Sequence, residues 1–231
     1  MLIENVSAIL RRMNHAALSA GRSPDGVKLI AVTKTVAIEK MKEALDIGLR
    51  IFGENRVQEV QKKVPVLKSE NSDSVIEWHL IGHLQKNKAK YAVRLFDLIH
   101  TVDSVELAEE INTQAEKIDK IQKVLVQVKL SIEETKHGAS EEELIPLLKK
   151  VQGMSNIQLE GLMTIPPFWE DPEKTRPYFR HLRELLDKAE NAGCILTELS
   201  MGMSNDFEVA IEEGATMVRI GTALFGERSA L

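Results

Sequence analysis

The sequence predicts a single (β/α)8 barrel of the TIM type, and three observations support this fold class. Eight short apolar runs rich in β-branched residues alternate with helical patterns along the chain. This alternation predicts a parallel sheet with crossover helices, and eight is the strand number of the closed barrel. The length of 231 residues suits one barrel, and no linker rich in proline, glycine or serine divides it. We therefore predict one domain over residues 1–231. A sheet wound open is the alternative, but no run has the character of an edge strand.

The expected strands are the apolar runs themselves. They cover residues 27–33, 49–53, 76–82, 97–102, 123–130, 159–165, 195–200 and 216–221. Between them, capping residues mark several helices. Ser140 and Glu143 form a capping-box pattern, although Pro146 lies inside this helix and predicts a kink or a later start. Asn205 and Glu208 are expected to cap the helix that follows the seventh strand.

An extra helix is expected at the N-terminus. Gly21 can end this helix, and the apolar residues that share one of its faces are Ile3, Val6, Leu10, Met13 and Ala17. After the eighth strand only about ten residues remain, too few for a covering helix. We therefore expect the N-terminal helix to fill that gap in the outer ring.

Composition excludes several classes of protein. The formal net charge of −5 gives no basic surface for nucleic acid or for an anionic membrane. Cys194 is the single cysteine, so no internal disulfide can form. No apolar run approaches the roughly 20 residues that span a bilayer, and charges interrupt the N-terminal apolar pattern, unlike a signal peptide. These features predict a soluble cytoplasmic protein.

Polar residues stand at the carboxyl ends of the expected strands, where barrels hold their active sites. In chain order they are Lys34, Asn55, His79 or His83, Asp103, Thr164, Ser200 and Arg219. Lys34 follows the apolar run of the first strand directly. Desolvation there disfavours the charged amine and makes it a better nucleophile toward a carbonyl. The alternative is an ordinary lysine whose stem lies along the barrel rim.

The loops after strands 7 and 8 have the composition of a phosphate site. Gly202 and Ser204 follow strand 7, and Gly221 and Thr222 follow strand 8. Glycines let backbone N–H groups approach an anion, and hydroxyls add donors. Ordinary turn and cap chemistry is the alternative for either loop alone. Both loops, however, occur at the corner where barrels often bind phosphate.

Arg219 lies within an apolar strand, where an unpaired guanidinium would be very costly. It needs either a carboxylate from another strand or an acceptor on a ligand. A phosphate site, a lysine for an aldehyde and an arginine for an acceptor together describe pyridoxal 5′-phosphate (PLP).

These residues also carry a family resemblance that spans nearly all of the chain. The chain resembles the PLP homeostasis protein family, which are one-domain relatives of the alanine racemase N-terminal barrel, a fold-type III PLP protein. The matching segments, in family order, are AVTK with Lys34, FGENRVQE (52–59), WHLIGHLQKNK (78–88), TKHG around Lys136, GLMTI (161–165), LSMGMSNDF (199–207) and VRIGTALFGER (218–228).

The resemblance implies roles for individual residues. Lys34 would form the Schiff base, or internal aldimine, and Arg219 would face the pyridine nitrogen. The phosphate cup would comprise Ser200, Gly221 and Thr222, and the residues near the cofactor would be Asn55, His79 and Met201. Lys136 would be a secondary cofactor contact or part of an exit route, with a surface lysine as the alternative. His83 departs from the family pattern, which often has proline there.

The same residues bear on mechanism. An arginine opposite the pyridine nitrogen cannot accept the proton that carbanion chemistry uses, because its pKa exceeds about 12. Racemisation also needs an acid or base on each face of the substrate. Tyr91 and Tyr178 are the two tyrosines, and both fall in expected helices. We therefore expect a monomeric protein that holds PLP reversibly, without evident turnover, and supplies it to apo-enzymes or buffers it.

Three other possibilities are open. The protein could be a PLP-dependent racemase or lyase of small amino acids, or a barrel that binds a phosphorylated metabolite without a Schiff base. The prolines of residues 166–177 could form a rigid lid after strand 6. His79 and His83 could pair on a metal, but no third ligand has recognisable spacing, so we predict no metal site.

Overall fold

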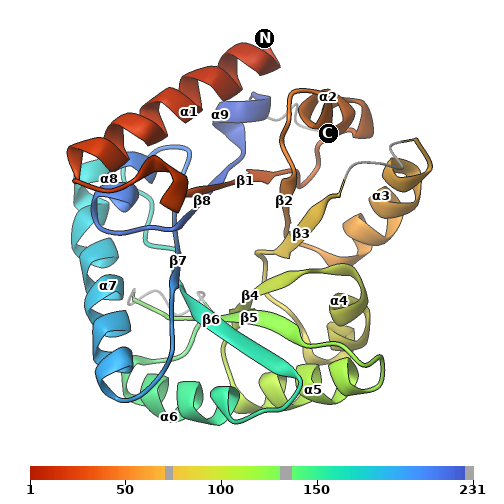
Figure 1. The fold of residues 1–231 in the computed structure, drawn as a ribbon, viewed down its shortest axis with the longest axis vertical. Coiled ribbons are helices and arrows are strands. Elements are labelled where there is room, and N and C mark those ends of the chain that lie inside the picture. The colour runs from red at the N-terminus through yellow and green to blue at the C-terminus, as the bar shows by residue number, and fades with distance from the viewer. Residues whose placement is uncertain (71–74, 131–136, 227–231) are drawn as a thin grey trace.

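The computed structural model describes residues 1–70, 75–130 and 137–226. Eight parallel strands pair in chain order, and the last pairs with the first, so the sheet closes into a barrel. Figure 1 shows the strands in a ring with the helices outside it. The strands are β1 Lys28–Val32, β2 Ile51–Glu54, β3 Glu77–Leu80, β4 Leu98–Val102, β5 Gln122–Gln127, β6 Ile157–Met163, β7 Glu198–Met203 and β8 Met217–Ile220. The predicted barrel is confirmed.

Every expected strand overlaps an observed one, and the seventh differs most. β7 begins at Glu198, where pairing with β6 begins, rather than at Ile195. The side chain of Ile195 is exposed, at 77%, so its apolar character does not mark a buried strand residue.

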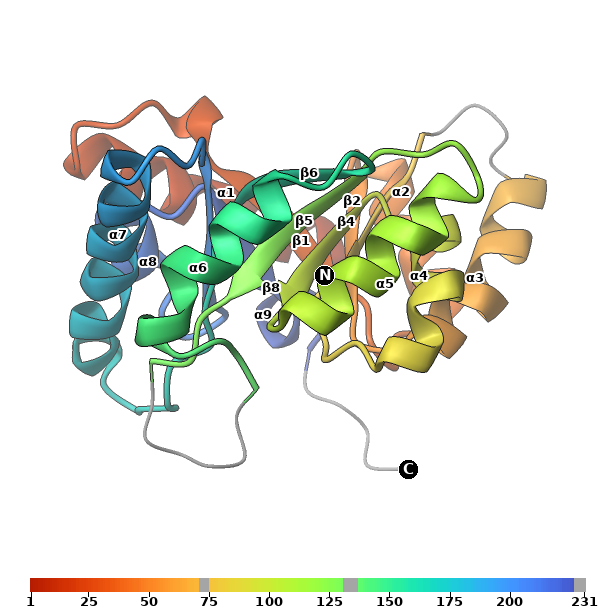
Figure 2. The ribbon, with the colours of Figure 1, turned by 90° about the horizontal axis from the view of Figure 1, so that it is seen from below.

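Helices cover the outside of the barrel, as the side view in Figure 2 shows for α5 and α6. Their bounds are α1 Leu2–Ser19, α2 Ile38–Asp46, α3 Val57–Glu70, α4 Ala89–Leu95, α5 Val105–Glu116, α6 Glu141–Gln152, α7 Arg176–Asn191, α8 Phe207–Glu212 and α9 Thr222–Phe225. No helix among the described residues combines the length and apolar character needed to cross a membrane.

The predicted capping residues are confirmed for α6 and are wrong for α8. Ser140 and Glu143 form the capping box of α6, and the helix runs through Pro146 from its expected start. The prediction for α8 was wrong, because Asp206 precedes its first residue. The side-chain amide of Asn205 instead donates to the carbonyl of Trp169, 2.9 Å away.

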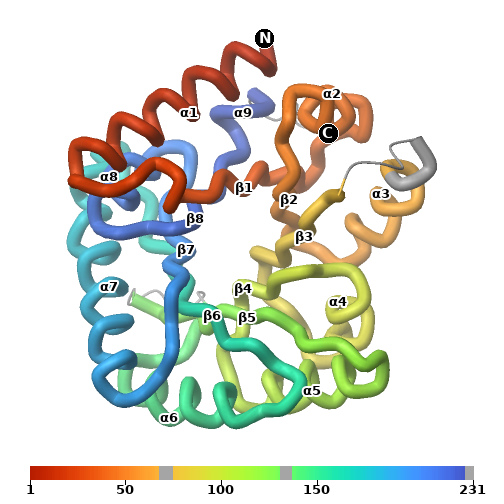
Figure 3. The backbone as a smooth tube through the Cα atoms, viewed as in Figure 1, coloured from red at the N-terminus to blue at the C-terminus, as the bar shows by residue number. Residues whose placement is uncertain are grey.

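α1 packs against α8 and α9 and fills the gap in the helical ring, as predicted (Figure 3). Its buried face is only partly the expected one. Ile3 is 57% exposed and Leu10 is also exposed, while Leu2 and Ile9 are buried. Adjacent apolar stripes on a helix both satisfy the 3.6-residue period, and the surface that the helix meets decides which of them is covered.

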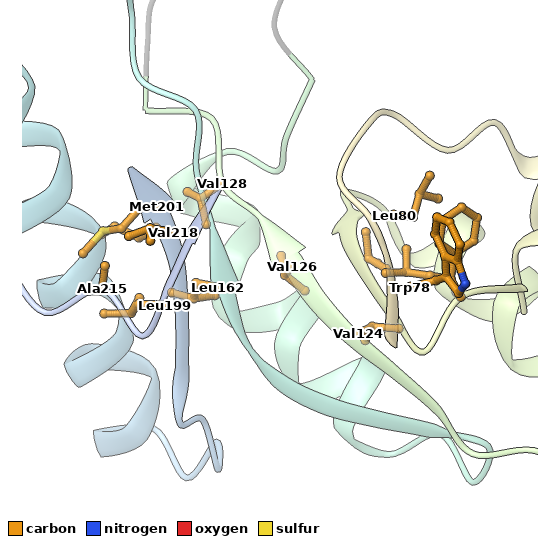
Figure 4. Packing of buried hydrophobic residues seen from close by; sticks show 14 of the residues in the cluster. Trp78, Leu80, Val124, Val126, Val128, Leu162, Leu199, Met201, Ala215 and Val218 are labelled. Carbon is orange, nitrogen blue, oxygen red and sulfur yellow. The ribbon is translucent and has the colours of Figure 1, made fainter. Parts of the chain in front are cut away.

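Alternation along the strands divides the core into two parts. Residues that point outward pack under the helices, as Figure 4 shows for Trp78, Val126 and Leu162. A smaller apolar cluster holds Ile30, Leu98, Leu125, Met163 and Met217. Because successive side chains on a strand face opposite sides, these residues point into the barrel. The residues two positions after Ile30, Leu98 and Met217 therefore also face the interior, near the carboxyl end of the barrel.

Candidate functional site

A cavity of about 650 Å³ opens at the carboxyl ends of the strands. Its walls come from the segments after β1, β2, β3, β6, β7 and β8, so six of the eight strand ends contribute. Of the residues predicted for the site, it is lined by Lys34, Asn55, Arg219, Gly221 and Thr222. The alternation of the strands explains why four of them meet, because Lys34, Asn55, Arg219 and Gly221 each lie an even number of residues from a strand position that faces the interior. Thr222 follows Gly221 as the first residue of α9.

The backbone beside Lys34 is held in an uncommon conformation. Thr35 has a φ of 61°, in the left-handed region that non-glycine residues rarely adopt. Its N–H donates to the Glu59 carboxylate at 3.1 Å, and its hydroxyl donates to the Lys34 carbonyl at 2.6 Å. These bonds compensate the strain of the turn and fix the direction in which the lysine leaves β1.

A buried ion pair supports this turn from behind. The Lys63 ammonium lies 2.6 Å from Glu54 Oε1 and donates to the Thr33 carbonyl at 2.7 Å. The Thr33 hydroxyl also donates to Glu54 Oε1, at 2.7 Å. Burial raises the pKa of Glu54, and the hydrogen bond from Lys63 opposes that rise. The cluster ties the ends of β1 and β2 to α3. Glu54 directly follows the expected strand at residues 49–53, which is a sequence signal that our predictions missed.

Arg219 forms the floor of the cavity and is 3% exposed. Its Nη1 donates to Ser200 Oγ at 2.5 Å, and its Nη2 donates to the Thr164 carbonyl at 2.8 Å. Burial lowers the pKa of Arg219 to about 10, and the nearby Asp206 carboxylate opposes that change. The guanidinium therefore stays protonated at neutral pH, held by two neutral acceptors.

A chain of buried hydrogen bonds continues from Ser200 through the barrel. Ser200 Oγ lies 2.9 Å from His100 Nδ1, and His100 Nε2 lies 2.9 Å from His79 Nδ1. His79 Nε2 in turn lies 2.8 Å from Glu77 Oε1, at the amino end of β3. The side chain of Glu77 is partly exposed, whereas the side chains of the two histidines are fully buried.

The ends of this chain determine its direction. An arginine only donates hydrogen bonds and an ionised carboxylate only accepts them. The hydrogen bond from His79 lowers the pKa of Glu77, which keeps that carboxylate ionised. With both rings neutral, Ser200 donates to His100, His100 to His79 and His79 to Glu77. Burial lowers the pKa of His100 well below its ordinary value, which agrees with a neutral ring. His100 was missed from sequence, although the alternation of LIHTV points it inward.

Three of the residues that the resemblance places around the cofactor do not line the cavity. Ser200 and His79 lie below its floor, within the hydrogen-bonded chain. Met201 is fully buried on the outer side of β7, among Leu199 and Val218 (Figure 4). Met201 is next to the inward-facing Ser200, so the two-residue period of the strand turns it toward the helices.

Of the two hydroxyls expected after the seventh strand, Ser204 lies at the corner between β7 and β8, and Ser200 does not. Ser204 lines the cavity, and its Oγ accepts from the N–H groups of Gly221 and Ala223, each at 3.3 Å. Thr222 lines the same corner. The corner thus gathers two hydroxyls and two backbone donors at the mouth of the barrel. Lys136, for which the resemblance implies a secondary cofactor contact, lies outside the described residues.

Comparison with known proteins identifies the class to which this barrel and site belong. The model of the alanine racemase N-terminal domain family matches residues 5–229, and the chain belongs to that class. Within it, the chain is 49% identical over 226 residues to the pyridoxal phosphate homeostasis protein of Aquifex aeolicus, covering 97% of each. It is 40% identical to the protein of that name from Vibrio alginolyticus, again over 97% of each. The chain is therefore a member of the pyridoxal phosphate homeostasis protein family.

A solved structure agrees with this placement. PipY of Synechococcus elongatus, determined with PLP bound, superposes with a TM-score of 0.84 at 37% identity, covering 98% of this chain and 100% of that chain. The predicted resemblance is confirmed.

Proposed function

We propose that this protein holds PLP at the mouth of its barrel, bonded reversibly to Lys34, and that it supplies or buffers the cofactor in the cell. The observation that carries the proposal is that Lys34, Arg219 and the Gly221–Thr222 corner line one cavity. The names of its relatives and the PLP bound to PipY support the same function. The cavity, at about 650 Å³, lies within the usual range for small-molecule sites.

The residues of the cavity fit the parts of PLP. When bound, PLP supplies an aldehyde that a lysine amine can bond reversibly. Lys34 is the residue that we assign to that bond. The hydroxyls of Ser204 and Thr222 and the N–H of Gly221 would hold the phosphate, with Ser204 in the role first expected of Ser200. Arg219 would donate to the ring nitrogen, and Asn55 would contact the ring from the opposite wall.

The charge on Arg219 supports storage of PLP over turnover of a substrate. Its pKa of about 10 leaves the guanidinium charged at neutral pH, so it donates a hydrogen bond and cannot accept a proton. A ring nitrogen that accepts this bond stays unprotonated and absorbs electrons poorly. His79 and Ser200 act indirectly, because their hydrogen-bonded chain orients the guanidinium from below.

The titratable groups at the cavity also favour storage of PLP over turnover of a substrate. Among the described residues that line it, those groups are Lys34, Lys40, Asp206 and Arg219. Asp206 Oδ1 already accepts from the N–H of Met203 at 2.7 Å, and burial raises the pKa of Asp206. The tyrosines lie on the outer helices α4 and α7. We further propose that the protein acts as a single-domain monomer in the cytoplasm; the described residues of the cavity all belong to the one closed barrel, which supports the single domain.

The visible spectrum of the purified protein tests the assignment of Lys34. The protein should show a PLP band, and borohydride should fix the cofactor to the peptide that contains Lys34. Lys34→Ala should lose the band while circular dichroism stays unchanged. Lys40→Ala is the matched control, because Lys40 lines the same cavity, and it should keep the band. A label on Lys40, or a band that survives in Lys34→Ala, contradicts the assignment.

The delivery role needs a second experiment. PLP-loaded protein is mixed with an apo-enzyme, and recovery of activity is compared with that given by an equal concentration of free PLP. Transfer faster than release into solution supports direct supply, and transfer at the release rate supports buffering. Turnover of small amino acids by the loaded protein would favour the racemase or lyase alternative.

A further inference from the structure

A second group of side chains lies beside the main cavity. His83 follows β3, Asp103 follows β4, and His137 precedes α6, so three separate loops bring them together. The rings of His83 and His137 stack with their centroids 3.6 Å apart and their planes 11° apart. His83 Nδ1 lies 3.6 Å from Asp103 Oδ2. One potential ligand atom from each residue lies within 4.8 Å of the others.

These separations fit ligands around an ion better than hydrogen bonds. A distance of 3.6 Å between His83 Nδ1 and Asp103 Oδ2 is too long for a hydrogen bond. Two ligands of a tetrahedral ion, each bonded at about 2.1 Å, lie about 3.4 Å apart. The separation of His83 and Asp103 is therefore close to that of two ligands of one ion, and the ligand atom of His137 lies within 4.8 Å of both.

The backbone on each side of the group is fixed by its neighbours. The side-chain amide of Gln127 donates to the His137 carbonyl at 2.8 Å. Gly138 has a φ of 140°, and a side chain there would meet the backbone of Lys129 at 2.7 Å. The Thr101 hydroxyl donates to the Gly82 carbonyl at 2.9 Å, which ties the residue before His83 to β4. The loops are thus held close while the imidazoles themselves stay accessible.

We propose that His83, Asp103 and His137 bind one divalent transition-metal ion of the zinc and nickel type. Two imidazoles and one carboxylate suit these ions, whereas magnesium and calcium prefer oxygen ligands alone. Stacked rings cannot both direct a nitrogen lone pair at one ion, so binding must turn at least one ring about its Cβ–Cγ bond. Both histidines are exposed, which leaves room for that rotation.

The proposed metal site lies next to the main cavity. His83 and His137 line a separate hollow of about 250 Å³, which shares Asn55, Ile81 and Ile165 with the larger one. An ion held by three protein ligands keeps open positions for water or a small anion. These positions would face the smaller hollow, beside and apart from Lys34.

Isothermal titration of the full chain with ZnCl2 and NiCl2, in phosphate-free buffer, tests the proposal. We expect one ion per chain, with MgCl2 giving no comparable binding. His83→Ala and His137→Ala should each weaken binding beyond the roughly 10- to 100-fold that loss of an outer-shell partner brings. His15→Ala, on the exposed face of α1, is the matched control and should change nothing. Binding that persists in both ligand variants overturns the proposal, as does an absence of binding.

Two further readouts separate this site from the others. Lys34→Ala should bind the metal as well as the unchanged protein does, whatever the outcome of the PLP experiments. In ¹⁵N spectra of the imidazoles, zinc should shift His83 and His137 and leave the other four of the six histidines unchanged. A shift confined to His181, which lies beside Glu141 and Glu184, would mean a surface site elsewhere.

Discussion

At the scale of single residues, the buried guanidinium of Arg219 depends on its hydrogen-bond acceptors. Its guanidinium is almost fully buried, and its described acceptors are the Ser200 hydroxyl and the Thr164 carbonyl. A buried donor that loses its acceptor costs more than the hydrogen bond itself contributed, since it also keeps its desolvation penalty. Residues that never touch a ligand can thus control both stability and the position of the guanidinium.

Ser200→Ala tests this dependence. The change removes the Nη1 acceptor of Arg219 and the donor to His100, so the free energy of unfolding should fall by about 1–3 kcal/mol. Urea denaturation measures the effect. Ser7→Ala, on the exposed side of α1, should stay within about 0.5 kcal/mol. Equal stability of the two variants would show that Arg219 finds another acceptor.

The tautomers of the two buried histidines follow from the direction of the hydrogen-bonded chain. His79 should carry on Nε2 the proton that it donates to Glu77, and the neutral ring of His100 should carry its proton on Nε2. Two-bond ¹H–¹⁵N correlation spectra distinguish this state from the Nδ1–H tautomer and from imidazolium. A proton on Nδ1 of His100 would instead mean that the hydrogen bonds run in the opposite direction.

The lowered pKa of His100 predicts a dependence of stability on pH. Below about pH 6.5, the unfolded chain binds a proton at this histidine and the folded protein does not. The free energy of unfolding should therefore fall as the pH decreases from about 6.5, by up to about 1.4 kcal/mol per pH unit, and level off below the folded pKa. His100→Gln should lack this contribution, so the difference between the two proteins is the quantity to measure. Parallel curves would contradict the assignment.

At the scale of elements, the connection from β7 to α8 sets the geometry of the site. Gly202 has a φ of 91°, and the register with β8 shifts between Ser200 and Met203. This irregularity ends the alternation of β7, so that Met203 lines the cavity although Met201 faces the helices. Ser204, the next residue, lies at the corner, where its Oγ accepts from the Gly221 N–H.

Gly202→Ala should therefore be costly. A side chain at this position would need a left-handed backbone, and its Cβ would lie 2.6 Å from Ala210 Cβ. We expect a loss of about 1–3 kcal/mol in the free energy of unfolding and weaker PLP binding. Gly153→Ala is the control, because its φ of −80° suits any residue and its nearest contact would be 3.5 Å. It should be neutral or stabilising by up to about 1 kcal/mol.

At the scale of the whole molecule, α1 completes the ring of helices beside α9, which follows β8 and has four residues. It contacts α8 and α9, and Arg12 pairs with Glu208 at 2.7 Å. Asn5 donates to the Leu224 carbonyl at 2.8 Å, which fixes the short α9 behind the Gly221 corner. The first helix of the chain thus supports the last part of the site.

Two neighbouring substitutions test this support. Ala17 is fully buried and Leu18 is 65% exposed. Ala17→Glu places an unpaired charge in the packed face and should cost about 3 kcal/mol or more. Leu18→Glu should change stability by less than about 0.5 kcal/mol. Similar losses for both would show that α1 is loosely attached.

The sequence by itself determined the strands, the closed barrel and the positions of Lys34, Asn55, Arg219, Gly221 and Thr222 at its mouth. These features depend on local patterns. The two-residue period of a strand predicts which side chains face inward, and the direction of the chain predicts which end of the barrel carries the loops of the site. Reading the period strictly would also have excluded Met201 and pointed to His100.

Only the tertiary structure decided what depends on register and on contacts between distant segments. Contacts across the barrel assign Ser200 to Arg219 and Ser204 to the Gly221 corner. The closure of β8 onto β1 brings the Arg219 and Lys34 ends together. The partners of His83 come from two other loops, so no spacing along the chain could reveal them. Hydrogen bonding between strands sets such positions, and its register is a property of the whole barrel.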